Sequence, residues 1–376
     1  MASTRAKGST KAPRVTEDLS STLAEALNKK FKESQVAFLL EREESPTDLD
    51  DFVSTGSVLV NIAATNRPDG GFPVGRISEI TGLEGTGKSL MAMHALADTQ
   101  RQGGVAVLID TETAVDENFL RTIGVDVSKL VYCPVDTIEQ VFELIEFMIE
   151  EIRSKDASTE KRLLTIVVDS VAAASTRIEQ ESGFDKDGYA TAKAIIISKS
   201  LRKITNMIGR ERVCLIFTNQ LREKMNVMAF ADKYTTPGGK ALPFHASLRI
   251  RLASKGKLDQ TRSGIKHVIG MSTVIEIKKT RMAPPHRKVE VPLYFDSGLD
   301  DYASWLDHLV KYKVISKAGK TCTYKDLKFQ VDDWRSMLED SDFRQQIINE
   351  LVHTLVLDRV TPESVVLSNV EVSDED

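Results

Sequence analysis

Eight residues limit what this chain can fold into more than any others. Residues 82–89 read Gly-Leu-Glu-Gly-Thr-Gly-Lys-Ser, and the apolar run 76–81 precedes them. Residues 90–97 continue as a predicted helix. A glycine-rich turn between a strand and a helix presents backbone N–H groups beside the positive end of the helix dipole. The pattern predicts a cradle for the phosphates of a nucleoside triphosphate, with a plain surface loop as the alternative.

The positions of this loop have separate predicted tasks. The Lys88 amine would reach the β- and γ-phosphates, and the Ser89 hydroxyl would hold Mg²⁺. ATP and Mg²⁺ are therefore the expected cofactors. The predicted phosphate-binding residues are Gly82, Leu83, Glu84, Gly85, Thr86, Gly87, Lys88, Ser89 and Leu90.

Composition restricts the class of protein. The 376 residues are 41% hydrophobic and 28% charged, as in soluble globular proteins. The longest apolar runs are too short to cross a membrane. Three widely spaced cysteines without a Cys-x-x-Cys pair indicate a reducing compartment, and six scattered histidines predict no zinc site.

Charge is distributed unevenly along the chain. Residues 331–376 contain twelve acids and three bases, a net charge of −9, so the total of −5 leaves +4 on residues 1–330. A basic body with an acidic tail suits an anionic ligand larger than ATP, with the tail as its competitor. A tail that only maintains solubility explains the charge equally well.

Strands and helices alternate after residue 57. Val/Ile/Leu strands separated by helices are typical of a parallel sheet that is covered on both faces. Three later strands without helices between them predict an antiparallel extension of that sheet. The predicted strands are 105–110, 163–169, 213–218, 247–252, 273–278 and 289–295, and the predicted helices between the first three are 138–152 and 190–208.

The two ends of the chain differ from this core. Helical spacing over 17–40 predicts an N-terminal helix that packs on another subunit, and residues 302–310 and 343–355 predict helices of a small C-terminal α/β domain. The expected organisation is a basic arm and helix (1–50), an α/β core (51–297), the C-terminal domain (298–367) and an acidic tail (368–376).

Polar residues end three of the predicted strands, where ligands bind in parallel α/β sheets. Asp169 suits a water-mediated contact to Mg²⁺. Glu112 could accept a proton from a water that attacks the γ-phosphate, or it could be an N-cap or turn carboxylate, because residues 111–113 also resemble a helix start. Gln220 could hydrogen-bond the γ-phosphate, although a strand-ending glutamine is usually without such a role.

An ordered series of motifs resembles the RecA-type homologous recombinases, in particular the phage branch typified by UvsX. The resemblance covers about residues 50 to 315, and its specificity lies in the order of the motifs. The motifs are Ser54–Ser57, Gly75–Ile77, Gly82–Ser89, Ile109–Glu112, Val167–Ala172, Ile216–Arg222, Thr235–Leu242 and Lys279–Pro284.

The resemblance implies roles for single residues. It makes Glu112 the catalytic carboxylate and Gln220 the γ-phosphate sensor, with Asp169 in the outer sphere of Mg²⁺. Asp116 and Phe119 fall where the family holds adenine. Lys279 and Arg281 fall where the family extends two cations onto the ATP of a neighbouring subunit. Cations supplied by a neighbour make hydrolysis conditional on assembly.

Two segments are predicted to contact DNA. The first, about residues 179–189, is polar but mostly acidic, so its contact is less certain than that of the second, residues 220–240. There, cations alternate with apolar side chains that could wedge between bases; a hydrophobic helix face is the alternative. The predicted DNA-binding residues are Arg202, Arg222, Lys224, Met225, Val227, Met228, Gly238 and Gly239, and Phe244 matches an aromatic at the subunit interface.

Together these features predict an ATP-dependent recombinase that forms filaments on single-stranded DNA and exchanges strands with homologous double-stranded DNA. Single-strand-binding and mediator proteins are the expected further partners, and the bacterial or phage-infected host cytoplasm is the expected location. A hexameric RecA-fold helicase and a non-catalytic recombination paralogue are the alternatives. The helicase would need an arginine finger in place of the Lys279 and Arg281 pair.

Overall fold

The computed structural model describes residues 19–31, 37, 39, 49–155, 161–181, 189–224, 233–262 and 264–357. They belong to two units, residues 1–48 and residues 49–376. In the first unit, helix α1 (Leu19–Lys30) ends before the predicted limit at residue 40. The Asn28 amide donates to the Ala37 carbonyl and accepts from the Ala37 N–H, both at 2.8 Å.

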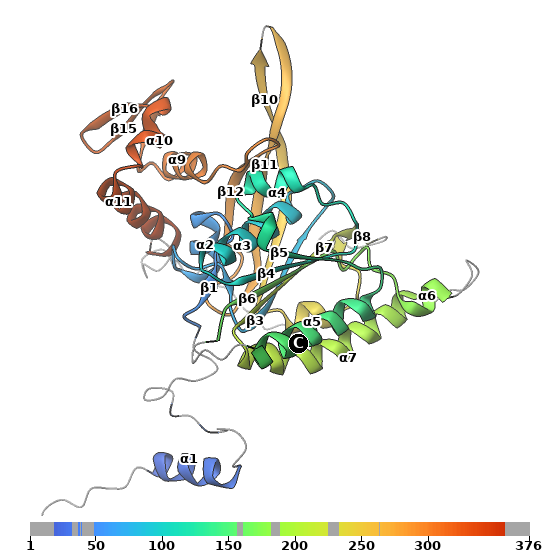
Figure 1. Cartoon of the computed structure of the whole chain (residues 1–376). Helices are drawn as coiled ribbons and strands as arrows, with labels where there is room; N and C mark the ends of the chain where they lie inside the picture. The colour runs from blue at the N-terminus through green and yellow to red at the C-terminus, as the bar shows by residue number, and fades with distance from the viewer. Residues whose placement is uncertain are drawn as a thin grey trace, which may run out of the picture. The chain divides into compact units, whose positions relative to one another are not determined.

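A nine-stranded mixed sheet organises the described part of the second unit (Figure 1). The strand order is β13-β12-β11-β10-β3-β7-β6-β4-β5. The six strands from β10 to β5 are parallel, and β11, β12 and β13 are antiparallel to their neighbours. The strands are β3 (Arg76–Gly82), β4 (Val105–Asp110), β5 (Leu130–Pro134), β6 (Leu164–Asp169), β7 (Val213–Gln220), β10 (Leu248–Arg262), β11 (Ile265–Thr280), β12 (Lys288–Tyr294) and β13 (Gly298–Leu299).

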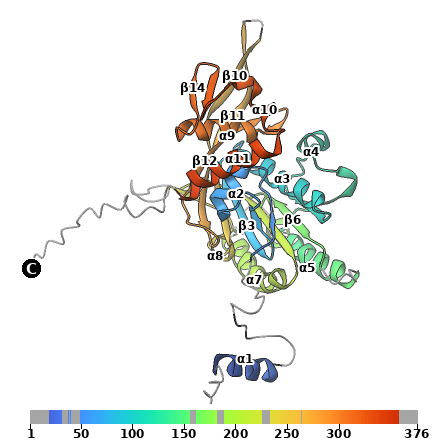
Figure 2. The ribbon, with the colours of Figure 1, turned by 90° about the vertical axis from the view of Figure 1, so that its left-hand side faces the viewer.

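The parallel core agrees with the sequence prediction, and the antiparallel extension needs two corrections. The predicted strand 247–252 begins β10, which pairs with β3 in parallel rather than antiparallel. The β10–β11 hairpin is also much longer than predicted and extends beyond the rest of the sheet (Figures 1 and 2). Its far half is exposed and held by pairing within the hairpin. No buried apolar pattern marks that half in the sequence.

Helices cover both faces of the sheet, and each face has its own hydrophobic cluster. Helices α5 and α7 lie together on one face and confirm the two predicted helices, whereas α2, α3 and α4 lie on the other (Figure 1). The helices of the core are α2 (Val58–Thr65), α3 (Lys88–Arg101), α4 (Glu117–Ile123), α5 (Ile138–Lys155), α6 (Arg177–Glu181), α7 (Tyr189–Arg210) and α8 (Ala241–His245).

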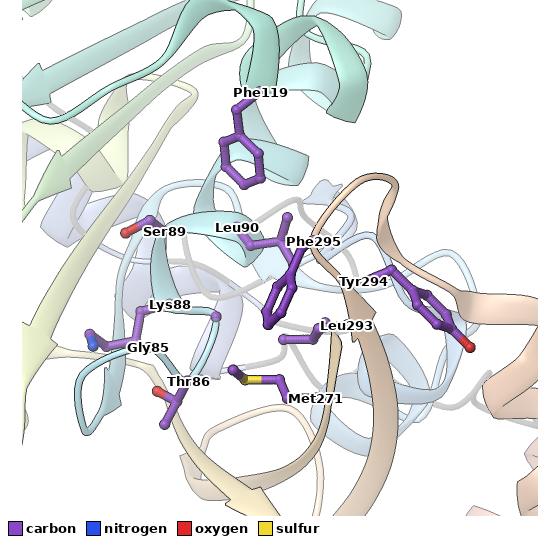
Figure 3. A pocket seen from close by; sticks show the side chains of 11 residues that line it. Gly85, Thr86, Lys88, Ser89, Leu90, Phe119, Met271, Leu293, Tyr294 and Phe295 are labelled. Atoms are coloured by element: carbon purple, nitrogen blue, oxygen red, sulfur yellow. The ribbon is translucent and has the colours of Figure 1, made fainter. Parts of the chain in front are cut away.

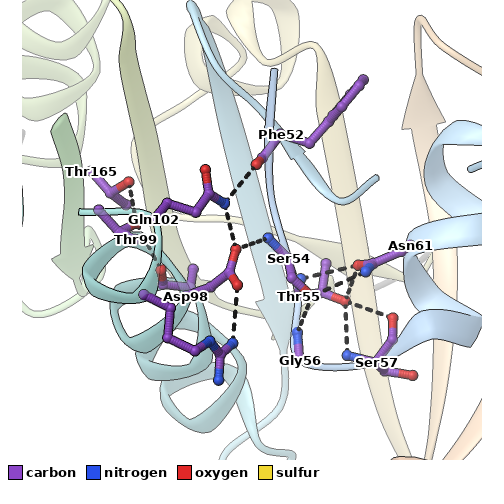
Figure 4. Close-up of polar contacts among 12 residues, drawn as sticks. Phe52, Ser54, Thr55, Gly56, Ser57, Asn61, Asp98, Thr99, Gln102 and Thr165 are labelled. Atoms are coloured by element: carbon purple, nitrogen blue, oxygen red, sulfur yellow. Dashed lines mark hydrogen bonds and ion pairs between the residues drawn. The ribbon is translucent and has the colours of Figure 1, made fainter. Parts of the chain in front are cut away.

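The segment that precedes α2 is tied to α3, the helix that follows the glycine-rich loop (Figure 4). Strand β1 (Phe52–Val53) pairs with β2 (Phe72–Pro73). The Ser54 N–H donates to the Asp98 carboxylate at 2.8 Å, and the Thr55 N–H donates to the Asn61 side chain at 3.0 Å. The motif at Ser54–Ser57 therefore connects α2 to α3.

The C-terminal elements share the hydrophobic cluster of α2 and α3 (Figure 2). The partly buried Asp301 carboxylate accepts from the Val58 N–H at 3.0 Å, and its desolvation raises the pKa of Asp301 to about 6. The elements are α9 (Asp301–Lys311), β14 (Ser316–Ala318), β15 (Thr321–Tyr324), β16 (Leu327–Gln330), α10 (Trp334–Met337), α11 (Ser341–Val352) and a π-helical turn (His353–Leu357). The predicted division at residue 297 stays a prediction, and the basic arm and acidic tail lie outside the described residues.

We expect His308 to make folding sensitive to acid. Burial lowers the pKa of His308 from 6.5 to about 4, and its Nε2 lies 3.0 Å from the Thr354 hydroxyl. The neutral ring stabilises the fold fully above about pH 6.5, and this contribution is lost as the pH falls through about 4. The free energy of unfolding should fall by up to roughly 3 kcal/mol over this range. Urea unfolding at pH 7 and pH 4.5 should show a smaller acid loss for His308→Gln than for wild type. His267→Gln, at an exposed position, is the control, and equal acid losses in all three proteins would contradict the expectation.

Candidate functional site

The carboxyl ends of four parallel strands bring the predicted nucleotide-site residues together. Gly82 at the end of β3 pairs with Gln220 at the end of β7, and the Leu221 N–H donates to the Gly82 carbonyl at 3.0 Å. Asp110 at the end of β4 pairs with Asp169 at the end of β6. Residues that are far apart in the sequence thus share one edge of the sheet.

The glycine-rich loop has the backbone that a phosphate cradle requires. Gly85 and Gly87 have φ angles of 69° and 93°, which favour glycine, and α3 begins directly afterwards at Lys88. A Cβ on Gly87 would lie 2.3 Å from the Leu293 side chain. The Lys88 amine is largely buried and donates to the Leu83 carbonyl at 2.9 Å. The amine is therefore held within the cradle itself.

Neighbouring groups in the cradle shift the pKa values of Lys88 and Asp169 in addition to the effect of burial. Burial lowers the pKa of Lys88, while the nearby Asp169, Glu112 and Glu84 raise it. Burial raises the pKa of Asp169, while hydrogen bonds from Ser89 and Thr218 lower it. The charges of Glu112 and Asp110 raise the pKa of Asp169 further, so an ionised Asp169 depends on the hydroxyl groups of Ser89 and Thr218.

Glu112 is positioned by residues that follow β4 and β6. The Ser170 hydroxyl donates to Glu112 Oε1 at 2.7 Å. The buried Asp110 carboxylate accepts from the backbone N–H groups of Glu112 and Thr113, both at 2.9 Å. Sequence reasoning missed Asp110, although an aspartate before Thr-Glu-Thr is a signal for such a turn. The alternative that Glu112 is the N-cap of a helix is wrong, because α4 begins at Glu117 and Asp116 caps it.

An apolar pocket continues from the phosphate loop (Figure 3). Phe119 from α4 and Phe295 after β12 both point into it, whereas the Tyr294 ring is directed away. The sequence predicted Phe119 but missed Phe295, because an apolar residue after a strand carries no specific signal. Asp116 caps α4, accepting from the Asn118 N–H at 2.6 Å, and its predicted place beside the adenine stays a prediction. The residues that line the pocket are Gly85, Thr86, Gly87, Lys88, Ser89, Leu90, Phe119, Met271, Leu293, Tyr294 and Phe295.

The segment after Gln220 leads away from the nucleotide site. Arg222 lies in β8 (Arg222–Glu223), which pairs with β9 (Tyr234–Thr235), and both Arg222 and Lys224 are exposed. Gly238 and Gly239 have φ angles of 88° and 76° and pass close to α7. Arg202 is exposed on α7. The predicted DNA contacts Met225, Val227 and Met228 lie outside the described residues.

Lys279 and Arg281 lie away from the phosphate loop of their own chain. In the sheet Lys279 pairs with Arg249, and Arg249 pairs with Glu79 of β3. Glu79 is three residues before Gly82, which corresponds to about 10 Å along the strand. Arg281 is two residues further on and is exposed. The Lys279 amine donates to the Phe244 carbonyl at 2.8 Å, and the Phe244 ring on α8 is 74% exposed.

Comparison with known proteins is consistent with this geometry. Residues 17–300 match the family model described as RecA N-terminal domain. The chain is 39% identical over 292 residues to a Protein RecA of Borrelia hermsii, an alignment that covers 77% of each chain. It is 35% identical over 304 residues to a Protein RecA of Clostridium acetobutylicum, with 80% and 82% of the two chains covered.

The chain belongs to the RecA family. The sequence predictions of a RecA-type fold and of an ATP-dependent recombinase are thereby confirmed, and the helicase and non-catalytic alternatives are not favoured. The protein is a DNA-dependent ATPase with strand-exchange activity, and the family binds ATP, single- and double-stranded DNA and forms filaments. None of the helices in the described residues is long and apolar enough to cross a membrane.

We expect Phe295 to hold the base rather than the phosphates of the nucleotide. Phe295→Ala should weaken ATP binding about 5- to 30-fold through the loss of stacking and apolar contact. Binding of inorganic tripolyphosphate, measured by competition with a fluorescent nucleotide, should be unchanged. Tyr294→Phe is the matched control, because that ring points away from the pocket (Figure 3). An equal loss for ATP and tripolyphosphate would show that Phe295 supports the loop instead.

Proposed function

We propose that this RecA-family chain hydrolyses ATP at the shared ends of β3, β4, β6 and β7, with Glu112 as the general base. The observation that carries the proposal is the convergence of Lys88, Glu112 and Asp169 on one sheet edge, where each influences the charge of another. Glu112 accepts the proton of the attacking water, and Lys88 binds the phosphates. The Ser170 hydroxyl, which bonds Glu112 Oε1, orients the carboxylate.

Mg²⁺ is the proposed metal at this site. The Ser89 hydroxyl lowers the pKa of the Asp169 carboxylate beside the cradle, and both groups offer the hard oxygen ligands that Mg²⁺ prefers. The partial burial of an acidic group next to a phosphate site also favours a bound cation. Bound there, Mg²⁺ would neutralise charge on the β- and γ-phosphates.

Gln220 is proposed as the link between ATP and DNA. It ends β7 beside Gly82 and begins the segment that carries Arg222 and Lys224. A hydrogen bond from its amide to the γ-phosphate would reposition that segment. Arg202, Gly238 and Gly239 are the other proposed DNA contacts among the described residues, and Met225, Val227 and Met228 stay predictions.

Subunit contacts are proposed to complete the active site. Lys279 and Arg281 lie toward the end of the sheet opposite their own phosphate loop, so a role at ATP requires the site of a neighbour. The exposed Phe244 ring, on the segment that Lys279 contacts, is the proposed packing group. Asp116 beside the adenine also stays a proposal.

The wider setting of the protein is proposed from the sequence motifs. Single-strand-binding and mediator proteins are the proposed partners, because a recombinase filament competes with other proteins for single-stranded DNA. The cytoplasm of a bacterium or of a phage-infected host is the proposed location. Membership of the phage UvsX-like branch rests on the order of the motifs, whereas the relatives reported above are bacterial RecA proteins.

Glu112→Gln should remove turnover without removing ATP-dependent binding of DNA. The amide keeps the shape of the side chain and its contact with Ser170 but cannot accept a proton, so we expect a loss of about 100-fold or more in ATP hydrolysis. ATP hydrolysis with and without single-stranded DNA, together with DNA binding, tests this. Wild-type turnover that ignores DNA, or a variant that hydrolyses ATP normally, would refute the proposed roles.

Mixed filaments can test whether the cations act across subunits. Neither Glu112→Gln nor the double variant Lys279→Ala/Arg281→Ala should hydrolyse ATP alone. An equal mixture should recover about a quarter of wild-type activity, because random order places an intact Glu112 opposite intact cations at one interface in four. A mixture as inactive as its components would show that the cations serve their own subunit.

A further inference from the structure

Glu79 is a carboxylate buried inside the sheet without a role in the proposed site. It lies on β3, three residues before the phosphate loop, and its side chain is 0% exposed. It faces the side covered by α7, where Ile77 of the same strand belongs to the cluster. A buried carboxylate is costly unless ionic and hydrogen-bonding partners surround it. Its partners therefore indicate why an acid stands at this position.

Two neighbouring strands supply those partners. Arg249 from β10 donates its Nε–H to Glu79 Oε2 at 2.6 Å, and Asn219 from β7 donates its Nδ2–H to Oε1 at 3.3 Å. The strand register places Arg249 directly opposite Glu79, and Lys279 of β11 directly opposite Arg249. Glu79 thus begins a row of charged side chains that crosses three strands.

Asn219 extends the network to the proposed DNA-binding segment. Its Nδ2 also donates to the Pro237 carbonyl at 3.1 Å, directly before the paired glycines 238 and 239. Its neighbour in sequence is Gln220, the proposed sensor. Among the described residues no donor reaches the buried Asn219 Oδ1. An unsatisfied buried acceptor is unfavourable, so the amide has a reason to change partners when the segment moves.

The other end of the row reaches the proposed subunit interface. The Lys279 amine donates to the carbonyls of Pro243 and Phe244 at 3.0 and 2.8 Å. Burial and the charges of Arg281 and Arg249 lower the pKa of Lys279, and Glu79 raises it. Glu79 is therefore the negative charge that offsets the positive charges of Arg249, Lys279 and Arg281.

We propose that Glu79 is a positioning residue that couples the nucleotide site to both the DNA segment and the interface cation. Through Asn219 it holds the segment at Pro237, and through Arg249 it holds β10, the strand on which Arg249 pairs with Lys279 of β11. When ATP binding shifts Gln220, the adjacent Asn219 transmits the shift to the DNA segment and, through Glu79, to the strands near Lys279. This inference rests on the proposed roles of Gln220 and Lys279 and adds the contacts that connect them.

The test measures how strongly the nucleotide controls DNA affinity. In the full chain, binding of a fluorescent oligo(dT) is measured with a non-hydrolysable ATP analogue and with ADP, and the ratio of the two affinities is compared. Glu79→Gln should leave ATP affinity unchanged and lower this ratio at least about fivefold, the low end of ordinary coupling between sites. Ser78→Ala is the matched control, since this buried hydroxyl on the same strand has no partner among the described residues, and it should keep the wild-type ratio.

Asn219→Ala removes the contacts with Glu79 and with the DNA segment at Pro237 but leaves the pair of Glu79 and Arg249 intact, so it tests the proposal even if Glu79→Gln folds poorly. It should lower the same ratio, and the double variant should be no worse than the stronger single variant, because both changes interrupt one connection. Ratios that stay at the wild-type value, or a loss of thermal stability with equal losses in both DNA affinities, would overturn the inference. A wild-type protein without nucleotide-dependent DNA affinity would overturn the proposed role of Gln220 as well.

Discussion

The parallel pairing of β3 with β7 is the contact on which the site depends. It places the start of the phosphate loop beside Gln220, and a backbone hydrogen bond from Leu221 to Gly82 closes the pairing at 3.0 Å. The pairing is stable because apolar clusters cover both faces of the sheet. The apolar strands thus decide where the polar residues meet, although they contribute no chemistry themselves.

Much of this fold could be predicted from the sequence because its signals are local. The strands at β4, β6 and β7 are short apolar runs, and the phosphate loop has glycines at fixed positions. Each continues into a helix or turn that the residues also indicate. By contrast, the far half of the β10–β11 hairpin is exposed and held by pairing between its own strands. No pattern of buried residues could mark its length.

The parts of the site that were missed depend on contacts between distant residues. Phe295 lines the pocket only because two intervening strands, β11 and β10, connect β12 to β3, the strand that leads into the loop. Glu79 was passed over because a single acid inside an apolar strand is uninformative without its partners. The predicted Glu112, Asp169 and Gln220 could be found because a strand end is visible in the sequence, and ligands gather at strand ends.

Gly87 illustrates how closely the two halves of the nucleotide pocket are packed. A single methyl group at this position would overlap the Leu293 side chain of β12, the strand that leads directly to Phe295. The phosphate loop and the strand that leads to the base end of the pocket are therefore in direct contact, because Gly87 has no side chain to separate them. The small size of Gly87 lets the phosphate loop and β12 approach closely. This distance allows a single nucleotide to contact the loop with its phosphates and Phe295 with its base.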